Sequence, residues 1–147
     1  MPHTAILAPV VALVAWTLVM QIWMYATRLP AMKRQGIDLK GRRGGRGGQL
    51  DGVLEDAVQW KAHNYNHLLE QPTLFYAIAI TLALSGGGRH WSVWLAWGYV
   101  GLRVLHSLIQ ATSNIVKWRF LVFTFASLVL LALTLHAGMI LLRVYGS

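Results

Sequence analysis

Four long apolar runs constrain this chain more than any other feature. They cover residues 5–27, 63–85, 91–112 and 118–142 of a sequence of 147 residues. A helix needs about 20 apolar residues to cross the roughly 30 Å of hydrocarbon in a bilayer. Four buried helices of a soluble domain are the alternative, but only 12% of the residues are charged, against about a quarter in a soluble domain. We therefore predict an all-α integral membrane four-helix bundle that forms one domain, 1–147.

The basic residues predict how the chain sits in the membrane. Most of them lie in the segment 28–60, and Lys117 and Arg119 lie near the start of the fourth run. The opposite side carries only Arg89 and Arg143. Because loops rich in Lys and Arg stay in the cytoplasm, we expect a basic cytoplasmic loop at 28–60 and both termini on the non-cytoplasmic side. The formal charge of +8 is then explained by the orientation of the chain in the membrane and by attraction of the basic loop to anionic lipid headgroups. We therefore expect membrane lipids as partners and no nucleic acid.

Within the basic loop, the stretch 41–48 consists of glycine and arginine alone. Such a composition cannot bury a core, so it is typical of a solvated linker. The functional alternatives are a flap near a cytoplasmic site and a contact with lipid headgroups.

Polar residues recur inside two of the apolar runs at helical spacing. They are His63, Asn66 and Glu70 in the second run, and Arg103, His106, Gln110 and Asn114 in the third. Neighbours in each set are three or four residues apart, so each set shares one face of a helix. Charged groups inside a membrane usually face a bundle interior or a wet cavity. Because the two helices run antiparallel, we expect an ion pair between Glu70 and Arg103, which either locks the bundle or belongs to a site.

Two further residues bear on a site. Pro72 removes a backbone hydrogen bond just after Glu70, and the resulting kink either opens a cavity or is a tolerated transmembrane proline. Arg119 falls at the inner interface, where a guanidinium could hold a thiolate and lower the pKa of the thiol. The chain has no cysteine, so such a thiol would arrive with a substrate. His63 and His67 are four apart, but no carboxylate completes a metal set, and we expect no metal site.

The pattern of these residues resembles the MAPEG family, the membrane-associated proteins in eicosanoid and glutathione metabolism. The positions that look like its second-helix signature are Lys61, His63, Asn66, Glu70, Pro72 and Phe75. Arg103 and His106 look like its third-helix Arg-x-x-His motif, and Arg119 falls where the thiol-activating arginine of the family opens the fourth helix. The four-run layout and the long basic first loop also match, so we interpret the chain as a divergent bacterial member.

The resemblance implies a homotrimer of four-helix subunits in the inner (plasma) membrane of a bacterium. It also implies glutathione as a co-substrate, bound between neighbouring subunits near the cytoplasmic face. The residues implied to bind glutathione are His63, Asn66, Glu70, Arg103, His106 and Gln110. Arg119 would be the catalytic residue, stabilising a thiolate that attacks a lipophilic small molecule.

Three classes of function follow. The first is a glutathione-dependent transferase or peroxidase acting on lipophilic electrophiles or hydroperoxides. The second is a non-catalytic membrane scaffold or lipid-binding subunit. It is favoured by the four-residue spacing of Asn66 and Glu70, and by Gln110, where characterised members of the family often carry a tyrosine. A channel or secondary transporter is the third class. It ranks behind the other two because four short helices leave little room for the repeats of transporters.

Overall fold

The structure, a computed structural model, describes residues 1–38, 40 and 43–145. Gly41 and Arg42, part of the stretch interpreted as a linker or flap, lie outside the described residues. Within these ranges the chain is helical and contains no strand, which confirms the all-α prediction. In chain order the elements are η1 (His3–Ile6), α1 (Leu7–Arg34), η2 (Gly47–Leu50), α2 (Asp56–Leu68), α3 (Gln71–Leu84), α4 (Trp91–Ala111) and α5 (Val116–Tyr145).

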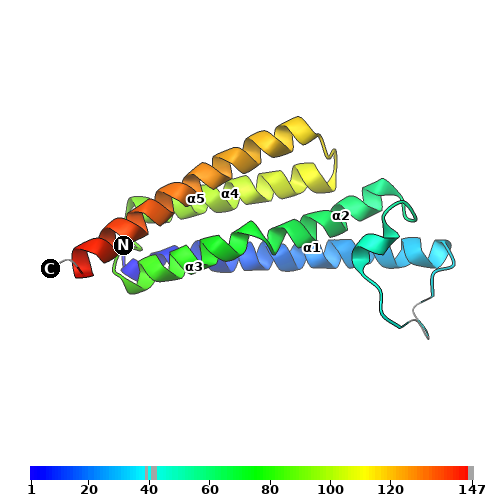
Figure 1. The fold of residues 1–147 in the computed structure, drawn as a ribbon, viewed down its shortest axis with the longest axis horizontal. Helices are drawn as coiled ribbons and strands as arrows, with labels where there is room; N and C mark the ends of the chain where they lie inside the picture. The colour runs from blue at the N-terminus through cyan, green and yellow to red at the C-terminus, as the bar shows by residue number, and fades with distance from the viewer. Residues whose placement is uncertain (39, 41–42, 146–147) are drawn as a thin grey trace.

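These elements form a four-helix bundle in which α2 and α3 together make one interrupted helix (Figure 1). That interrupted helix lies along α1, and the hairpin of α4 and α5 packs against the other side. Both chain ends lie at the same end of the bundle as the connection between α3 and α4, and the segment between α1 and α2 lies at the opposite end (Figure 1). The predicted bundle of four antiparallel helices is therefore confirmed within one chain.

The first two helices extend beyond the predicted membrane spans. Helix α1 continues to Arg34, and α2 begins at Asp56, so part of the predicted basic loop is helical and the connecting segment is 35–55. A small apolar cluster explains the extension because it packs the end of α1 against the start of α2. Its buried members are Ala31, Met32, Leu54 and Val58.

Three of the helical segments described are long and apolar enough to cross a membrane: His3–Arg34, Asp56–Leu84 and Val116–Arg143. Helix α4 has 21 residues but carries a buried polar face, which includes Arg103 and Gln110, and this face lowers its mean hydropathy. In lipid, such a face is stable where neighbouring helices cover it. The polar character of α4 therefore reflects its position in the bundle.

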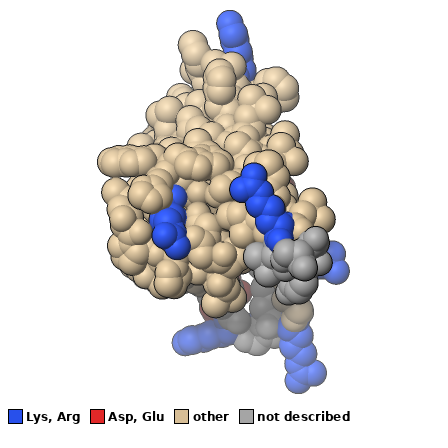
Figure 2. Space-filling view, turned by 90° about the vertical axis from the view of Figure 1, so that its left-hand side faces the viewer, with Lys and Arg blue, Asp and Glu red and all other residues tan. Residues whose placement is uncertain are grey.

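The end of the bundle that carries the termini is tightly closed. A Cβ atom added at Gly88 would lie 2.1 Å from the carbonyl oxygen of His3 and 2.7 Å from Cγ2 of Ile6. Figure 2 views this end and shows mostly uncharged residues, with a few separate Lys and Arg side chains. The glycine is needed here because the chain leaving α3 passes directly against η1. This contact anchors one end of α4 and leaves the opposite end to form the site.

Candidate functional site

The break between α2 and α3 is the first element of the candidate site. Helix α2 ends at Leu68, and α3 begins at Gln71 with Pro72 in its first turn. Proline has no backbone N–H, so the carbonyl of Leu68 cannot receive the usual helical hydrogen bond. The hydroxyl and backbone N–H of Thr73 instead donate to the carbonyl of Glu70, which starts α3 afresh. The disturbance that Pro72 indicated in the sequence is therefore a complete interruption of the helix.

Arg103 of α4 occupies this break. Its Nη2 donates to the carbonyl oxygen of His67 at 3.0 Å and to Nδ1 of the same residue at 3.1 Å. The side chain is 0% exposed, and its guanidinium carbon lies 5.7 Å from the centre of the Phe123 ring. Arg103 thus caps the C-terminal end of α2, where a cation is favourable and free carbonyl groups need donors.

The expected ion pair between Glu70 and Arg103 is not formed. Among the described residues the salt bridge found joins His63 to Asp51, while the side chain of Glu70 is exposed on the subunit surface. His63, Asn66 and Glu70 are all exposed. The side chains of α2 that form hydrogen bonds with α4 are instead Asn64, which donates to Ser107, and His67, which contacts Arg103. The helical period predicted which residues lie together, but it did not predict which face of α2 meets α4.

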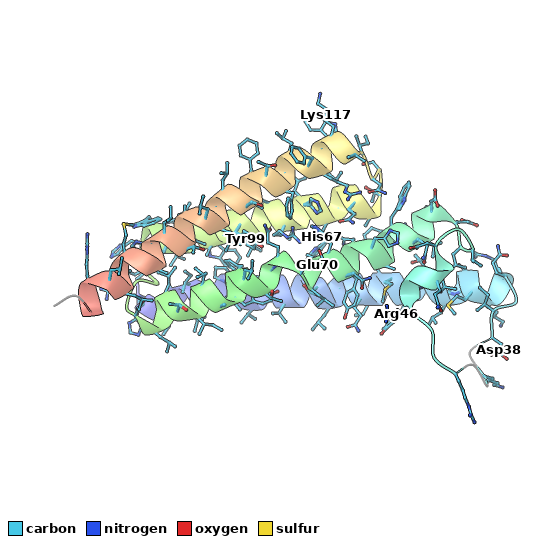
Figure 3. The ribbon with its side chains drawn as sticks, viewed as in Figure 1. Asp38, Arg46, His67, Glu70, Tyr99 and Lys117 are labelled. Atoms are coloured by element: carbon cyan, nitrogen blue, oxygen red, sulfur yellow. The ribbon has the colours of Figure 1, made fainter. Side chains whose placement is uncertain are left out.

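His67 and His106 form a stacked pair beside Arg103. Their ring centres are 4.9 Å apart with an angle of 21° between the planes, and Phe123 lies 5.3 Å from the His67 ring. His106 is 3% exposed, and its Nδ1 has no hydrogen-bond partner among the described residues. In the sequence, His67 stood out only as half of a metal pair with His63. Figure 3 places His67 between α2 and the α4–α5 hairpin, and no group of three metal-ligating side chains occurs in the part of the chain described.

Arg119 completes this site from the first turn of α5. Its Nη1 donates a hydrogen bond to Oδ1 of Asn114, whose φ of 51° turns the chain sharply between α4 and α5. A cavity of about 200 Å³ opens beside it. The lining residues are His67, His106, Val116, Arg119, Phe120 and Phe123. Lys117, two residues earlier, is exposed and projects away from the bundle (Figure 3).

The structure therefore brings together three of the predicted site residues, Arg103, His106 and Arg119, and adds His67. Gln110 is 4% exposed and buried along α4, and its Oε1 has no hydrogen-bond partner in the described part of the chain, but it does not line this cavity. His63, Asn66 and Glu70 are exposed and are not among the residues that line the cavity within one subunit. One signal for His67 was present in the sequence, because it lies in the turn just before the break at Pro72.

His63 belongs to a second polar cluster near the start of α2. Oδ1 of Asp51 accepts a hydrogen bond from Nε2 of Gln59 and lies 2.9 Å from Nε2 of His63. Two hydrogen bonds hold the pKa of the Asp51 carboxyl below its usual value, and the one from Gln59 has a larger effect than the one from His63. A cavity of about 300 Å³ lies here and also contacts Asn114, so it adjoins the turn that holds Arg119.

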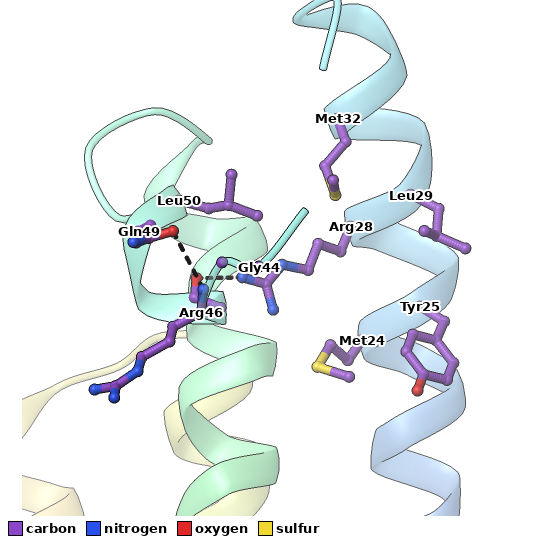
Figure 4. A pocket seen from close by; sticks show the side chains of 11 residues that line it. Met24, Tyr25, Arg28, Leu29, Met32, Gly44, Arg46, Gln49 and Leu50 are labelled. Carbon is purple, nitrogen blue, oxygen red and sulfur yellow. Dashed lines mark hydrogen bonds between the residues drawn. The ribbon is translucent and has the colours of Figure 1, made fainter. Parts of the chain in front are cut away.

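A third cavity, of about 300 Å³, lies between α1 and the glycine-rich segment 44–47 (Figure 4). Arg28 donates a hydrogen bond to the carbonyl of Gly47 and so ties this segment to α1. The walls on the α1 side are mainly apolar, with Met24, Leu29 and Met32. The cavity shares no lining residue with the Arg119 cavity, so the described part of the Gly/Arg stretch does not cover the candidate site.

The fold and the site together define an integral membrane protein whose four helices enclose polar side chains around an arginine-lined cavity. Comparison with known proteins places it more narrowly. The MAPEG family model matches residues 6–139, which is most of the chain, and the protein therefore belongs to the MAPEG family. This confirms the resemblance found in the sequence. Comparisons with curated proteins and with solved structures return no match.

Proposed function

We propose that this protein is a glutathione-dependent transferase or peroxidase that acts on lipophilic electrophiles or hydroperoxides. We place it in the inner membrane of a bacterium as a homotrimer, with both termini on the non-cytoplasmic side and the Arg119 cavity at the cytoplasmic face. A lipophilic substrate would arrive through the bilayer, and the hydrophilic thiol would arrive from the cytoplasm. Holding the two together supplies part of the rate.

The observation that carries the proposal is the position of the Arg119 guanidinium. It lines an open cavity, and Asn114 and the fold of α5 hold it in place. A positive charge and its N–H groups favour a thiolate over a thiol, and the thiolate is the nucleophile. The sulfur would then form a bond to an electrophilic carbon as a leaving group departs. With a hydroperoxide it would attack the terminal oxygen and break the O–O bond, and the alkoxide would take a proton from water and leave as the alcohol. A second glutathione would convert the resulting sulfenic acid to a disulfide and water.

The proposed trimer accounts for two features of the single subunit. The Arg119 cavity, at about 200 Å³, is smaller than the roughly 300–1,000 Å³ of most small-molecule sites. Asn66 and Glu70 also lie exposed in the middle of a membrane-spanning helix, where contact of a carboxylate with lipid is costly. A neighbouring subunit would cover Glu70 and enlarge the binding site, and Asn66 and Glu70 would then contact glutathione there.

The test is a comparison of Arg119→Ala with Lys117→Ala. Both changes remove one positive charge from the first turn of α5, but only Arg119 lines the cavity. Stopped-flow measurement of thiolate absorbance after mixing with glutathione should show an amplitude at least about tenfold lower in Arg119→Ala, because a nearby charge shifts a pKa by about 1–3 units. Lys117→Ala should keep the wild-type signal. An unchanged thiolate signal in Arg119→Ala removes this residue from the proposed role.

A non-catalytic scaffold or lipid-binding subunit is the second candidate. The small volume of the cavity and the burial of Gln110 away from it favour this function. A binding titration of the detergent-purified oligomer separates the two candidates. Failure to bind glutathione, together with a lipid retained between subunits, would support the scaffold and exclude the enzyme.

A further inference from the structure

The contact between Arg103 and His67 determines which nitrogen of His67 carries hydrogen. Nδ1 of His67 lies 3.1 Å from Nη2 of Arg103. A guanidinium has N–H groups only and cannot accept a hydrogen bond. Nδ1 must therefore be the acceptor, so the neutral imidazole carries its hydrogen on Nε2. The second contact of the same Nη2, to the carbonyl of His67 at 3.0 Å, holds the arginine in this position.

Since Nδ1 of His67 is bonded to Arg103, Nε2 is the ring nitrogen left available to the cavity that His67 lines. His67 is half-buried and lines the cavity, and His106 stacks against one face of its ring at 4.9 Å. Phe123 packs against the same ring at 5.3 Å. The ring therefore has little freedom to turn, and turning it would also break the bond from Arg103.

The polar groups that line this cavity come from three residues: His67, His106 and Arg119. No carboxylate is among the described lining residues, although the carboxylate of Glu70 lies close enough to interact electrostatically with His67 and Arg103. The remaining lining residues, Val116, Phe120 and Phe123, are apolar. The guanidinium of Arg103 lies behind His67 and adds a second buried positive charge. With N–H donors and two nearby cations, Arg103 and Arg119, set against the carboxylate of Glu70, the cavity is suited to an anion.

We infer that His67 is a second hydrogen-bond donor to the anion bound in this cavity, where its Nε2–H acts beside the guanidinium of Arg119. The inference rests on the proposed function only for the identity of that anion as the thiolate of glutathione. Arg103 is then a positioning residue, because it acts on the anion through the tautomer of His67. The ligand class is an anion, or an anionic group, small enough for about 200 Å³.

Two substitutions of His67 separate its donor from its structural contact. His67→Asn places an amide near the position of Nδ1, which keeps an acceptor for Arg103 but removes the donor from the cavity. His67→Gln extends an amide N–H to the position of Nε2, which keeps the donor and alters the contact to Arg103. If His67 acts only by supporting the helix break, His67→Asn should lower the affinity for the anion less than His67→Gln does. If His67 donates to the anion, His67→Asn should lower that affinity more.

Thiocyanate and glutathione serve as probes, each titrated by calorimetry into the detergent-purified protein. Hydrogen bonds to charged groups are worth about 1.5–3 kcal/mol, so we expect His67→Asn to bind both anions at least about tenfold more weakly than wild type. His67→Gln should keep most of the affinity. Histidine ¹⁵N spectra of the wild type should show hydrogen on Nε2 of His67, and thiocyanate should shift that signal.

The outcomes also separate this inference from the proposed function. Thiocyanate binding that weakens in His67→Asn, with no glutathione turnover in the wild type, would support the donor and reject the enzyme. Equal binding of thiocyanate by wild type and His67→Asn, absence of thiocyanate binding by the wild type, or hydrogen on Nδ1 of His67 would each overturn the inference, whatever the enzyme activity.

Discussion

The substitution Gly88→Ala is expected to destabilise the bundle, because its new methyl group has no space. The added Cβ would lie 2.1 Å from the carbonyl oxygen of His3 and 2.7 Å from Cγ2 of Ile6. A carbon atom and a carbonyl oxygen stay roughly 3.3 Å apart even when they form a weak C–H···O hydrogen bond. The His3 carbonyl would therefore have to move by about 1 Å. That carbonyl belongs to η1, whose Ile6 is 0% exposed. The change therefore either strains the packed end of the bundle or displaces η1 from it.

Strain at the packed end and displacement of η1 are expected to lower the free energy of unfolding by similar amounts. Overpacking a close-packed site costs typically about 1–3 kcal/mol. Exposing an isoleucine to water costs about 1.5–3 kcal/mol, and less where detergent covers it. For a chain of about 150 residues each kcal/mol lowers the melting temperature by about 2–4 °C, so we expect a fall of roughly 3–10 °C.

Gly101→Ala is the matched control. Gly101 lies in α4, and a Cβ there would meet no atom within 4 Å. Alanine is a better helix former than glycine by about 1 kcal/mol, so this variant should melt at or above the wild-type temperature. Circular dichroism of the detergent-purified proteins at one scan rate measures both. If Gly88→Ala melts like the wild type, or if the two variants lose the same stability, the close contact of Gly88 with η1 does not limit the stability of the bundle. Thiolate formation should be unchanged in Gly88→Ala, because Arg119 lies beyond the opposite end of α4.

Two further predictions concern polar contacts. The pKa of Asp51 should lie below 3.8 in the folded protein, because Gln59 and His63 donate to the ionised carboxylate. The stabilisation from this cluster is then present above the unfolded pKa and is lost as the pH falls through the lower folded pKa. A carboxyl ¹³C titration checks this, with Gln59→Leu expected to return the midpoint toward 3.8, and a wild-type midpoint at or above 3.8 contradicts it. The buried hydrogen bond from Asn64 to Ser107 should give a coupling of about 0.6 kcal/mol in a double-mutant cycle of alanine variants, and additive losses would show that the pair contributes nothing.

The helices, the break at Pro72, the polar face of α4 and the family could all be predicted from short stretches of the sequence. The length of the apolar runs predicted the four helices, and Pro72 predicted the disturbance of the second one. The polar residues of α4 were recognisable because their spacing matches one helical face, and the structure buries that face. The prediction of the family also rested on short motifs, and the family model confirms it.

The amino-acid sequence alone determined which side chains share a helix face, because that follows from 3.6 residues per turn. It did not determine which face of α2 meets α4. The opposite charges of Glu70 and Arg103 predicted an ion pair between them, whereas the folded chain pairs Arg103 with His67. Only the tertiary structure decided this, since α2 ends at Leu68 and the packing of α4 places the guanidinium within reach of the carbonyl of His67 in the last turn of α2.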